Sequence, residues 1–243
     1  MGSFPRSRGQ PRVPDGLRIY AMTDIHGRAD LLQQLFRVID RDIAASSHIR
    51  PIHVFLGDYI DRGAYSRQTI DLLIDRARRF ECVFLKGNHE MVFLEMLARE
   101  GYEDHWLRYG GLQTLLSYGV QPSPKFDKAE RAALIDELRH RIPPTHVHFM
   151  QSLRPCFACG DFFFVHAGVR PDLPLNEQND KDLCWIRDEF LLSTKKFEKF
   201  IVHGHSPVDA PDRRPNRINI DTGAYATDNL TLLSIQGDRM LAV

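Results

Sequence analysis

The chain is poor in the features that mark secreted, membrane and nucleic-acid-binding proteins. It has only 4 cysteines among 243 residues, and without an export signal we expect free thiols rather than disulfides. No apolar run approaches the roughly 20 residues that span a bilayer. Lys+Arg and Asp+Glu both number 32, so no excess of positive charge favours nucleic acid. We therefore expect a cytoplasmic protein with neither a membrane nor a nucleic-acid partner.

The beginning of the chain differs in composition from the rest. Residues 1–16, MGSFPRSRGQPRVPDG, consist mainly of Pro, Gly, Arg and Ser, which predicts a disordered N-terminal arm. Residues 17–243 contain no internal repeat and no clear linker. We expect them to form a single domain, which at this length can bury a sizeable core.

The first half of the chain alternates strand and helix signals. Apolar runs predict strands at 17–22, 52–57 and 81–87. Helical periodicity or composition follows each run, at 29–44, 66–79 and 90–100. Strands that alternate with helices indicate an α/β fold with parallel pairing and right-handed crossovers.

Residues 102–150 have a different character and predict a helical insertion over one edge of the sheet. We expect its core to contain Trp106, Leu107, Leu112, Leu115 and Leu116. Its histidines are expected to be solvated: His105, His140, His146 and His148. Strand signals then return at 156–168, 199–205, 217–223 and 229–243.

Five of the predicted strands are followed at once by Asp, Asn or His. These residues are Asp24 and His26, Asp58, Asn88 and His89, His166, and His203 and His205. Ligand sites of open α/β sheets lie beyond the carboxyl ends of the strands, so we expect these side chains to converge.

Carboxylate, imidazole and amide oxygen together suit divalent ions such as Mn, Fe or Zn. A carboxylate can bridge two ions, and Asp58 is the candidate bridge. Asp24 and His26 would complete one metal site, and Asn88, His166 and His205 the other. Two ions that share a water lower its pKa, and the resulting hydroxide is the expected nucleophile.

Three further residues follow the predicted ligands closely. A carboxylate that hydrogen-bonds one imidazole nitrogen fixes the tautomer, so Asp61 could orient His89. His89 could then protonate a leaving alkoxide. Arg62 offers a planar fork that suits two phosphate oxygens.

Taken in order, the motifs TDIHG, GDYIDRG, GNHE, HAG and GHSP resemble those of calcineurin-like metallophosphoesterases. The resemblance covers residues 18 to about 236 and is to the phosphoprotein phosphatase branch, above all short bacterial and phage serine/threonine phosphatases. It implies a β-sandwich of two facing mixed sheets flanked by helices, with a dinuclear centre that often contains Mn. It also implies the ligand set Asp24, His26, Asp58, Asn88, His166 and His205, the acid pair Asp61 and His89, and Arg62 as a phosphate ligand.

Two further assignments rest on the same resemblance. WIRDEF is similar to the segment with a second phosphate-binding arginine, here Arg187, although Trp185 beside it could instead indicate a cation–π contact. IDTGAY is similar to a segment that approaches the site, but we expect Tyr225 to be a packing residue. For His203 a buried spectator and a supporting role stay open. The sequence departs from the family pattern at Lys86, Thr23 and the alanine of HAG, none of which removes a ligand.

The leading hypothesis is a metal-dependent phosphomonoesterase, a serine/threonine protein phosphatase acting on phosphoproteins or small phosphorylated substrates. The alternative is a dinucleoside polyphosphate hydrolase, such as one that cleaves diadenosine tetraphosphate symmetrically. A regulatory protein that binds metal without turnover is disfavoured because Asp61, Arg62 and His89 are all present. No feature of the sequence specifies an oligomeric state.

Overall fold

The computed structural model describes residues 2–3, 9–46, 48–99, 101–123 and 127–243. Its first sheet has the strand order β1-β11-β10-β2-β3-β4. The strands are β1 (Gly2–Ser3), β2 (Leu17–Met22), β3 (Arg50–Phe55), β4 (Glu81–Phe84), β10 (Leu233–Gln236) and β11 (Arg239–Ala242). Strands β2, β3 and β4 are parallel, whereas β10 and β11 are antiparallel to their neighbours, so the sheet is mixed.

The second sheet has the order β5-β6-β7-β9-β8. Its strands are β5 (Cys156–Cys159), β6 (Phe162–Val165), β7 (Phe200–His203), β8 (Asp212–Arg213) and β9 (Arg217–Asn219). Parallel pairing joins β6, β7 and β9, and antiparallel strands lie at both edges. The sequence therefore predicted correctly that two mixed sheets form the fold.

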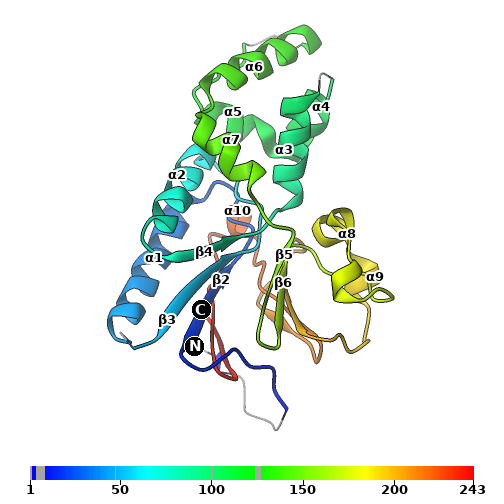
Figure 1. The fold of residues 1–243 in the computed structure, drawn as a ribbon. Coiled ribbons are helices and arrows are strands. Elements are labelled where there is room, and N and C mark those ends of the chain that lie inside the picture. Colours follow the sequence, from blue (N-terminus) through cyan, green and yellow to red (C-terminus); the bar gives the residue numbers. More distant parts are fainter. Residues whose placement is uncertain (1, 4–8, 47, 100, 124–126) are drawn as a thin grey trace.

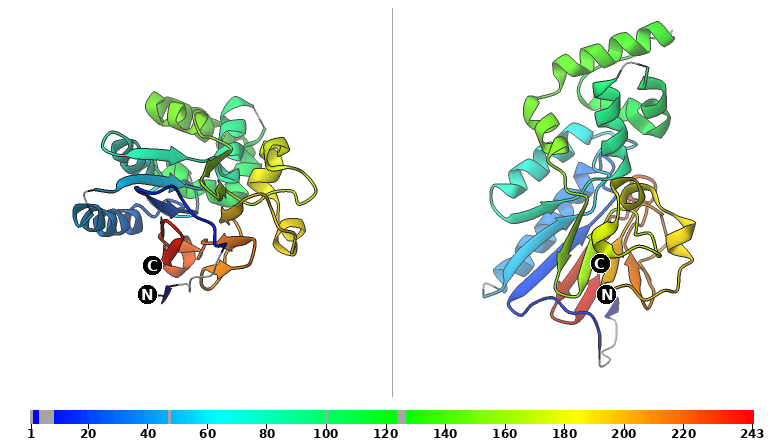
Figure 2. Two further views of the ribbon diagram at one scale, coloured as in Figure 1. Left: turned by 60° about the horizontal axis from the view of Figure 1, so that its bottom comes forward. Right: turned by 45° about the vertical axis from the view of Figure 1, so that its right-hand side comes forward.

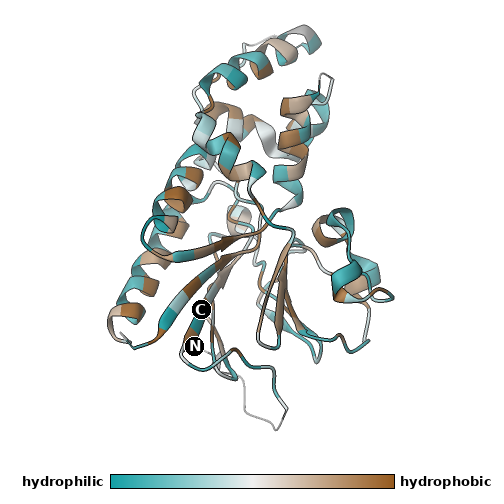
Figure 3. Ribbon diagram, in the orientation of Figure 1, coloured by the Kyte–Doolittle hydropathy of each residue, from teal (hydrophilic) through white to brown (hydrophobic). Residues whose placement is uncertain are grey.

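The two sheets face each other and carry helices on their outer faces (Figures 1 and 2). On β2, Ile19 and Ala21 point into the core between the sheets, while Tyr20 and Met22 pack under the helices, as the two-residue period of a strand requires. Helices α1 (Ala29–Ala44) and α2 (Ser66–Ala77) cover the first sheet, and α8 (Asp180–Trp185) and α9 (Asp188–Leu191) cover the second. Apolar residues accordingly concentrate along the strands (Figure 3).

Helices also occupy the predicted insertion, beyond the carboxyl ends of β2, β3 and β4 (Figure 1). They follow α3 (Asn88–Ala98) and are α4 (Glu103–Trp106), a kinked π-helical turn η1 (Leu107–Gly111), α5 (Leu112–Ser117), α6 (Lys128–Arg141) and α7 (Pro144–Gln151). Trp106 and Leu115 are fully buried as expected, but Leu116 is 47% exposed because α5 turns that side outward.

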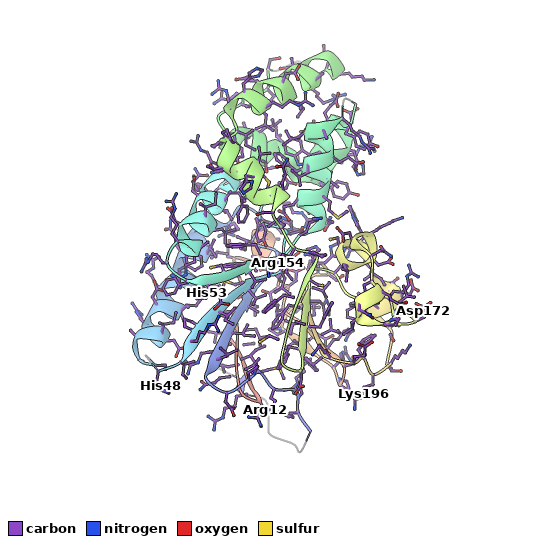
Figure 4. The ribbon with its side chains drawn as sticks, viewed as in Figure 1. Arg12, His48, His53, Arg154, Asp172 and Lys196 are labelled. Carbon is purple, nitrogen blue, oxygen red and sulfur yellow. The ribbon has the colours of Figure 1, made fainter. Side chains whose placement is uncertain are left out.

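The expectation for one histidine of the insertion is also wrong. His146 is buried rather than solvated, because its ring lies between Tyr118 and Asp71. The other three histidines of the insertion are exposed. After α7 the chain returns to the sheets at Arg154, which is labelled in Figure 4 and exchanges backbone hydrogen bonds with the end of β4.

The expected N-terminal arm lies only partly within the described residues, which omit residue 1 and residues 4–8. Residues 9–16 are described, and there the structure differs from the expectation, because Val13 is fully buried between the sheets. The backbone N–H of Arg12 also donates to Asp161 at 2.9 Å. Gly2 and Ser3 pair with β11.

Two short helical segments complete the described elements: η2 (Leu175–Glu177), which is a 3₁₀ turn, and α10 (Ala224–Thr227). All four cysteines are free thiols. Within the described part of the chain, each helix is too short or too polar to cross a bilayer.

Candidate metal centre

Six predicted ligands follow strand ends and converge where the two sheets meet the insertion. They are Asp24 and His26 after β2, Asp58 after β3, Asn88 after β4, His166 after β6 and His205 after β7. Each side chain is buried, with an exposed fraction of 5% or less. The parallel strands of each sheet end at a common edge, and this explains why residues so far apart in the chain meet.

The backbone at these strand ends is held in an unusual conformation. Among the described residues, seven non-glycine residues have positive φ, and six of them belong to the site: Asp24, His26, Asp58, Asp61, Arg62 and His205. Such φ values are uncommon outside glycine and tend to cluster at functional sites. At Gly87 the approach is so close that an added Cβ would collide with Oδ1 of Asp58. The turns therefore hold four of the six ligands, Asp24, His26, Asp58 and His205, at the cost of local strain.

Asp58 lies between two groups of possible metal-binding atoms. One group contains His26, Asp58 and His89, the other Asp58, His166 and His205, and in each the ligand atoms lie within 4.8 Å of one another. Oδ2 of Asp58 is 3.6 Å from Nε2 of His26, and Oδ1 is 3.5 Å from Nε2 of His166. The two oxygens of one carboxylate thus face two separate clusters, as a bridging ligand requires.

The hydrogen bonds around the imidazoles fit metal binding. Nδ1 of His166 donates to the carbonyl of Leu56 at 3.0 Å, so Nε2 presents a lone pair, and it faces the amide oxygen of Asn88 at 3.0 Å. Nδ1 of His26 donates to the carbonyl of Ile60 at 2.9 Å, so its Nε2 likewise presents a lone pair to Asp58. Acceptors that face each other repel unless a cation lies between them. The residues present therefore fit two divalent ions.

Burial keeps these imidazoles neutral, which is the form that binds metal. It lowers the pKa of His26 well below its usual value and also lowers the pKa of His166. The carboxylate of Asp24 lines the same pocket and accepts from the backbone N–H of His205 at 3.0 Å. Asp24 thus ties the end of β2 to the end of β7.

His89 and Asp61 form the hydrogen-bonded pair that the sequence predicts. Nδ1 of His89 lies 2.8 Å from Oδ2 of Asp61, and both side chains are buried. Nη2 of Arg62 lies 3.3 Å from Nε2 of His89, and because a guanidinium only donates, Nε2 is the acceptor. Nε2 is also 3.8 Å from Oδ2 of Asp58, so geometry alone would allow His89 to be a ligand.

Burial shifts the pKa values of this pair in opposite directions. It raises the pKa of Asp61 to about 7, although hydrogen bonds from Thr114 and Trp106 oppose the shift. It lowers the pKa of His89 to about 3, with a further contribution from the positive charge of Arg62. Without an anion in the pocket, His89 is therefore a neutral imidazole.

A pocket of about 190 Å³ opens over the candidate ligands. Both predicted phosphate-binding arginines, Arg62 and Arg187, line it, and Nη1 of Arg187 lies 3.3 Å from the hydroxyl of Ser206. Aromatic side chains form part of the rim: Tyr109, Trp185 and Tyr225. The rings of Tyr109 and Trp185 meet edge to face at 5.9 Å. A phosphate in this pocket would meet two guanidinium groups under an aromatic rim.

Tyr225 lies in the pocket rather than in the packing position expected for it. It is 39% exposed, and the guanidinium of Arg62 lies over its ring, 4.5 Å from the ring centroid. The edge of the ring also meets His26 at 5.4 Å. Tyr225 therefore stacks on Arg62, the predicted phosphate-binding arginine.

Asp221 is a pocket residue that the sequence analysis missed. It lies directly after β9 and Ile220, and it is buried. Burial and then the nearby charge of Asp24 raise the pKa of Asp221 to about 8. The signal was present in the sequence, since RINID repeats the pattern of an apolar strand followed by a carboxylate.

His203 does not reach the pocket. It is buried at the end of β7 beside Phe190, at a ring separation of 4.9 Å, and its Nδ1 lies 3.1 Å from the carbonyl of Gly204. These contacts support the spectator interpretation of His203.

Comparison with known proteins shows the family of the chain. The family model described as calcineurin-like phosphoesterase matches residues 17–235. The chain is 26% identical over 230 residues to a bis(5'-nucleosyl)-tetraphosphatase PrpE [asymmetrical] of Anoxybacillus flavithermus, covering 86% of this chain and 87% of that protein. It is 24% identical over 229 residues to the protein of the same name of Halalkalibacterium halodurans, covering 86% and 87%.

Solved structures share the fold at lower identity. A candidate diadenosine tetraphosphatase aligns with a TM-score of 0.64 and 17% identity, covering 93% of this chain and 92% of that chain. A cold-active protein tyrosine phosphatase aligns with a TM-score of 0.61 and 15% identity, covering 99% and 85%. With a family match over nearly its whole length, the chain belongs to the calcineurin-like phosphoesterases and is an enzyme that hydrolyses phosphoesters.

Proposed function

We propose that this pocket hydrolyses a phosphate ester or anhydride whose phosphorus lies between the two arginines and the metal ligands. The observation that carries the proposal is the position of Asp58, whose two oxygens face two ligand clusters beneath Arg62 and Arg187. A dinuclear centre with adjacent guanidinium groups suits the charge that develops on a transferring phosphoryl group.

The six ligands of the sequence analysis are proposed to hold two divalent ions, with Mn as the favoured metal and Fe or Zn as alternatives. When bound, such ions polarise the phosphoryl group and lower the pKa of bound water. Asp58 would be the ligand that both ions share. The backbone strain at the strand ends keeps the ligand positions preorganised.

The other residues of the pocket have roles that need no metal. Arg62 and Arg187 would bind the phosphate oxygens, since a guanidinium recognises two oxygens at once. In the structure Arg62 donates to Nε2 of His89. A phosphate that binds this guanidinium frees the lone pair of Nε2, and the negative charge of the phosphate favours protonation of the ring by solvent. The protonated Nε2 can then donate its proton to the leaving oxygen while Nδ1 donates to Asp61.

A dinucleoside polyphosphate is the substrate that we favour. The curated relatives are named as asymmetrical bis(5'-nucleosyl)-tetraphosphatases, and the alignments to them cover 86% of this chain. The pocket rim offers Tyr109 and Trp185, whose rings could stack on a nucleobase. The relatives' names also favour asymmetrical cleavage over the symmetrical cleavage considered first.

Phosphoserine or phosphothreonine in a protein is the second candidate. The pocket itself is small, about 190 Å³, which suits one phosphate group on a protruding side chain. A protein phosphatase does not need aromatic side chains that stack on a base. A contribution of Tyr109 or Trp185 to substrate binding would therefore favour the dinucleoside polyphosphate over the phosphoprotein.

The experiment compares substrates on purified protein loaded with Mn, Fe or Zn. Diadenosine tetraphosphate should be hydrolysed faster than a phosphoserine peptide and should yield ATP with AMP rather than two ADP. Faster hydrolysis of the peptide would favour the phosphatase candidate. Inactivity toward both substrates and p-nitrophenyl phosphate with every divalent metal would overturn the proposed function.

A variant pair tests the aromatic rim. Trp185→Ala should weaken binding of diadenosine tetraphosphate by about 1–3 kcal/mol, the usual contribution of one stacked base. It should affect p-nitrophenyl phosphate less, because that substrate has no base. Tyr65→Ala is the matched control, since Tyr65 is exposed and is not a residue of the pocket. Equal losses on both substrates would exclude base stacking at Trp185.

A further inference from the structure

The helical insertion contributes two hydrogen-bond donors to the carboxylate of Asp61. The hydroxyl of Thr114 donates to Oδ1 at 2.7 Å, and the indole N–H of Trp106 lies 3.1 Å from Oδ1 and 3.2 Å from Oδ2. The third donor is Nδ1 of His89, which lies 2.8 Å from Oδ2. Asp61, Trp106 and Thr114 are fully buried, so water does not compete for these bonds.

These donors fix the orientation of the carboxylate. Thr114 occupies Oδ1, Trp106 reaches both oxygens from the insertion side, and Oδ2 is left facing His89. The backbone N–H of Asp61 also donates to the hydroxyls of Thr114 and Ser66, at 2.9 Å and 3.1 Å. The hydroxyl of Thr114 thus contacts both the backbone and the side chain of Asp61.

We infer that Thr114 and Trp106 are positioning residues for catalysis, which act by orienting Asp61 and through it the imidazole of His89. The inference rests on the proposed role of the Asp61–His89 pair. It gives the insertion a part in the proton transfer in addition to any part in shaping the substrate groove. A rotated Asp61 would leave Nδ1 of His89 without its acceptor, and the ring would no longer present Nε2 to the leaving oxygen.

If the hydrogen bonds from Thr114 and Trp106 to Asp61 were purely structural, a different result would be expected. A buried indole N–H and a buried hydroxyl need acceptors, and Asp61 could serve only to satisfy them and hold the insertion on the sheets. In that case loss of the Thr114 hydroxyl would lower stability, but turnover of the folded protein would be unchanged.

The first experiment is a double-mutant cycle on p-nitrophenyl phosphate. Thr114→Val removes the hydroxyl at constant shape and should lower kcat about tenfold, a part of the roughly 10²–10⁴-fold contribution of general acid catalysis. KM and bound metal should stay the same. Thr114→Ser, which retains the hydroxyl, should restore most of the turnover.

The same substitution in Asp61→Asn protein shows whether Thr114 acts through Asp61. In Asp61→Asn protein, Thr114→Val should cause little further loss of kcat, since residues that act through one another are non-additive. Ser117→Ala is the matched control, because Ser117 lies on the same helix and donates to the carbonyl of Thr114, without contact to Asp61. A tenfold loss that persists in the Asp61→Asn background would overturn the inference, as would an unchanged kcat in Thr114→Val.

A readout without metal or substrate separates this inference from the proposed function. In metal-free, ¹⁵N-labelled protein, the Nδ1 proton of His89 should be protected from exchange by Asp61. Thr114→Val should shift its resonance and speed its exchange, while Ser117→Ala should do neither. If the wild type hydrolyses no phosphoester, the proposed function fails and this measurement still decides the inference. An unaltered His89 resonance in Thr114→Val would overturn the inference even in an active enzyme.

Discussion

The strand ends and the helical insertion meet at one pocket but contribute to it differently. The strand ends supply the six candidate metal ligands, and four of these, Asp24, His26, Asp58 and His205, have a strained backbone with positive φ. The insertion supplies no ligand of that set, but it adds two donors to Asp61 and the rim residue Tyr109. The first region would hold the metals, and the second would orient what surrounds them. Because these contributions are separable, variants in the two regions should fail in different ways.

The largest expected effect is the loss of the proposed proton donor, His89, at the start of α3. His89→Asn should lower turnover of p-nitrophenyl phosphate by about 10²–10⁴-fold, the usual contribution of a positioned acid. Bound metal, measured by elemental analysis, should stay at the wild-type level.

Metal content is the decisive measurement here, because Nε2 of His89 lies 3.8 Å from Oδ2 of Asp58. If His89→Asn loses one ion, His89 is a ligand and the role given to it is wrong. Asp58→Asn is the positive control, since a change in the shared carboxylate should reduce binding of both ions.

The strand ends could be predicted from the sequence because sheet geometry determines where they go. An apolar run followed by Asp or His places the polar group at the carboxyl edge, and parallel strands bring such groups together. Asp58, His166 and His205 were found in this way. Asp221 follows the same rule but was not predicted, because the segment IDTGAY was considered only for Tyr225.

The insertion could be predicted only as a set of helices. Helical periodicity identifies the apolar face of a segment, but it does not show which neighbour that face will contact. Trp106 was expected in the insertion's core, and it is buried, yet its N–H reaches Asp61. Contacts of this kind depend on how the insertion docks on the sheets, which no local pattern in the sequence records.

The docking itself can be tested at Gly110, where the insertion meets Arg62. Gly110 has a φ of +95°, and its carbonyl accepts from the N–H of Arg62 at 3.1 Å. A Cβ at this position would lie 2.8 Å from the backbone N of Arg62, so Gly110→Ala must displace one of the two segments. We expect kcat/KM to fall severalfold, in addition to about 1–2 kcal/mol of stability lost to the left-handed backbone.

Gly119→Ala is the matched control for Gly110→Ala. Gly119 has a φ of +79° in the same insertion, and its added Cβ would come no closer than 3.3 Å to a side-chain nitrogen of Arg141. It should therefore lose similar stability, measured by chemical denaturation, but keep its activity. Equal activities in the two variants would show that the insertion does not position Arg62.

The smallest expected effect concerns how the insertion is held together. Tyr118 lies 2.9 Å from Nδ1 of His146, and Nε2 of His146 lies 3.0 Å from Asp71 on α2. With Nε2–H bound to the carboxylate, Nδ1 is the acceptor of the Tyr118 hydroxyl. Tyr118→Phe leaves this buried nitrogen without a partner and should cost about 1 kcal/mol of unfolding free energy, or about 2–4 °C in Tm.

The contrast between the two regions predicts that Tyr118→Phe affects stability alone. Within the described chain, the hydrogen bonds and ring contact of Tyr118 and His146 join them to each other and to Asp71, not to Asp61 or Arg62. The kcat at a temperature well below Tm should therefore match the wild type. Tyr65→Phe is the control, since the exposed Tyr65 should change stability by less than about 0.5 kcal/mol. A drop in kcat without a drop in Tm would mean that packing far from Asp61 also tunes the pocket, and the insertion could not be divided into a catalytic and a structural part.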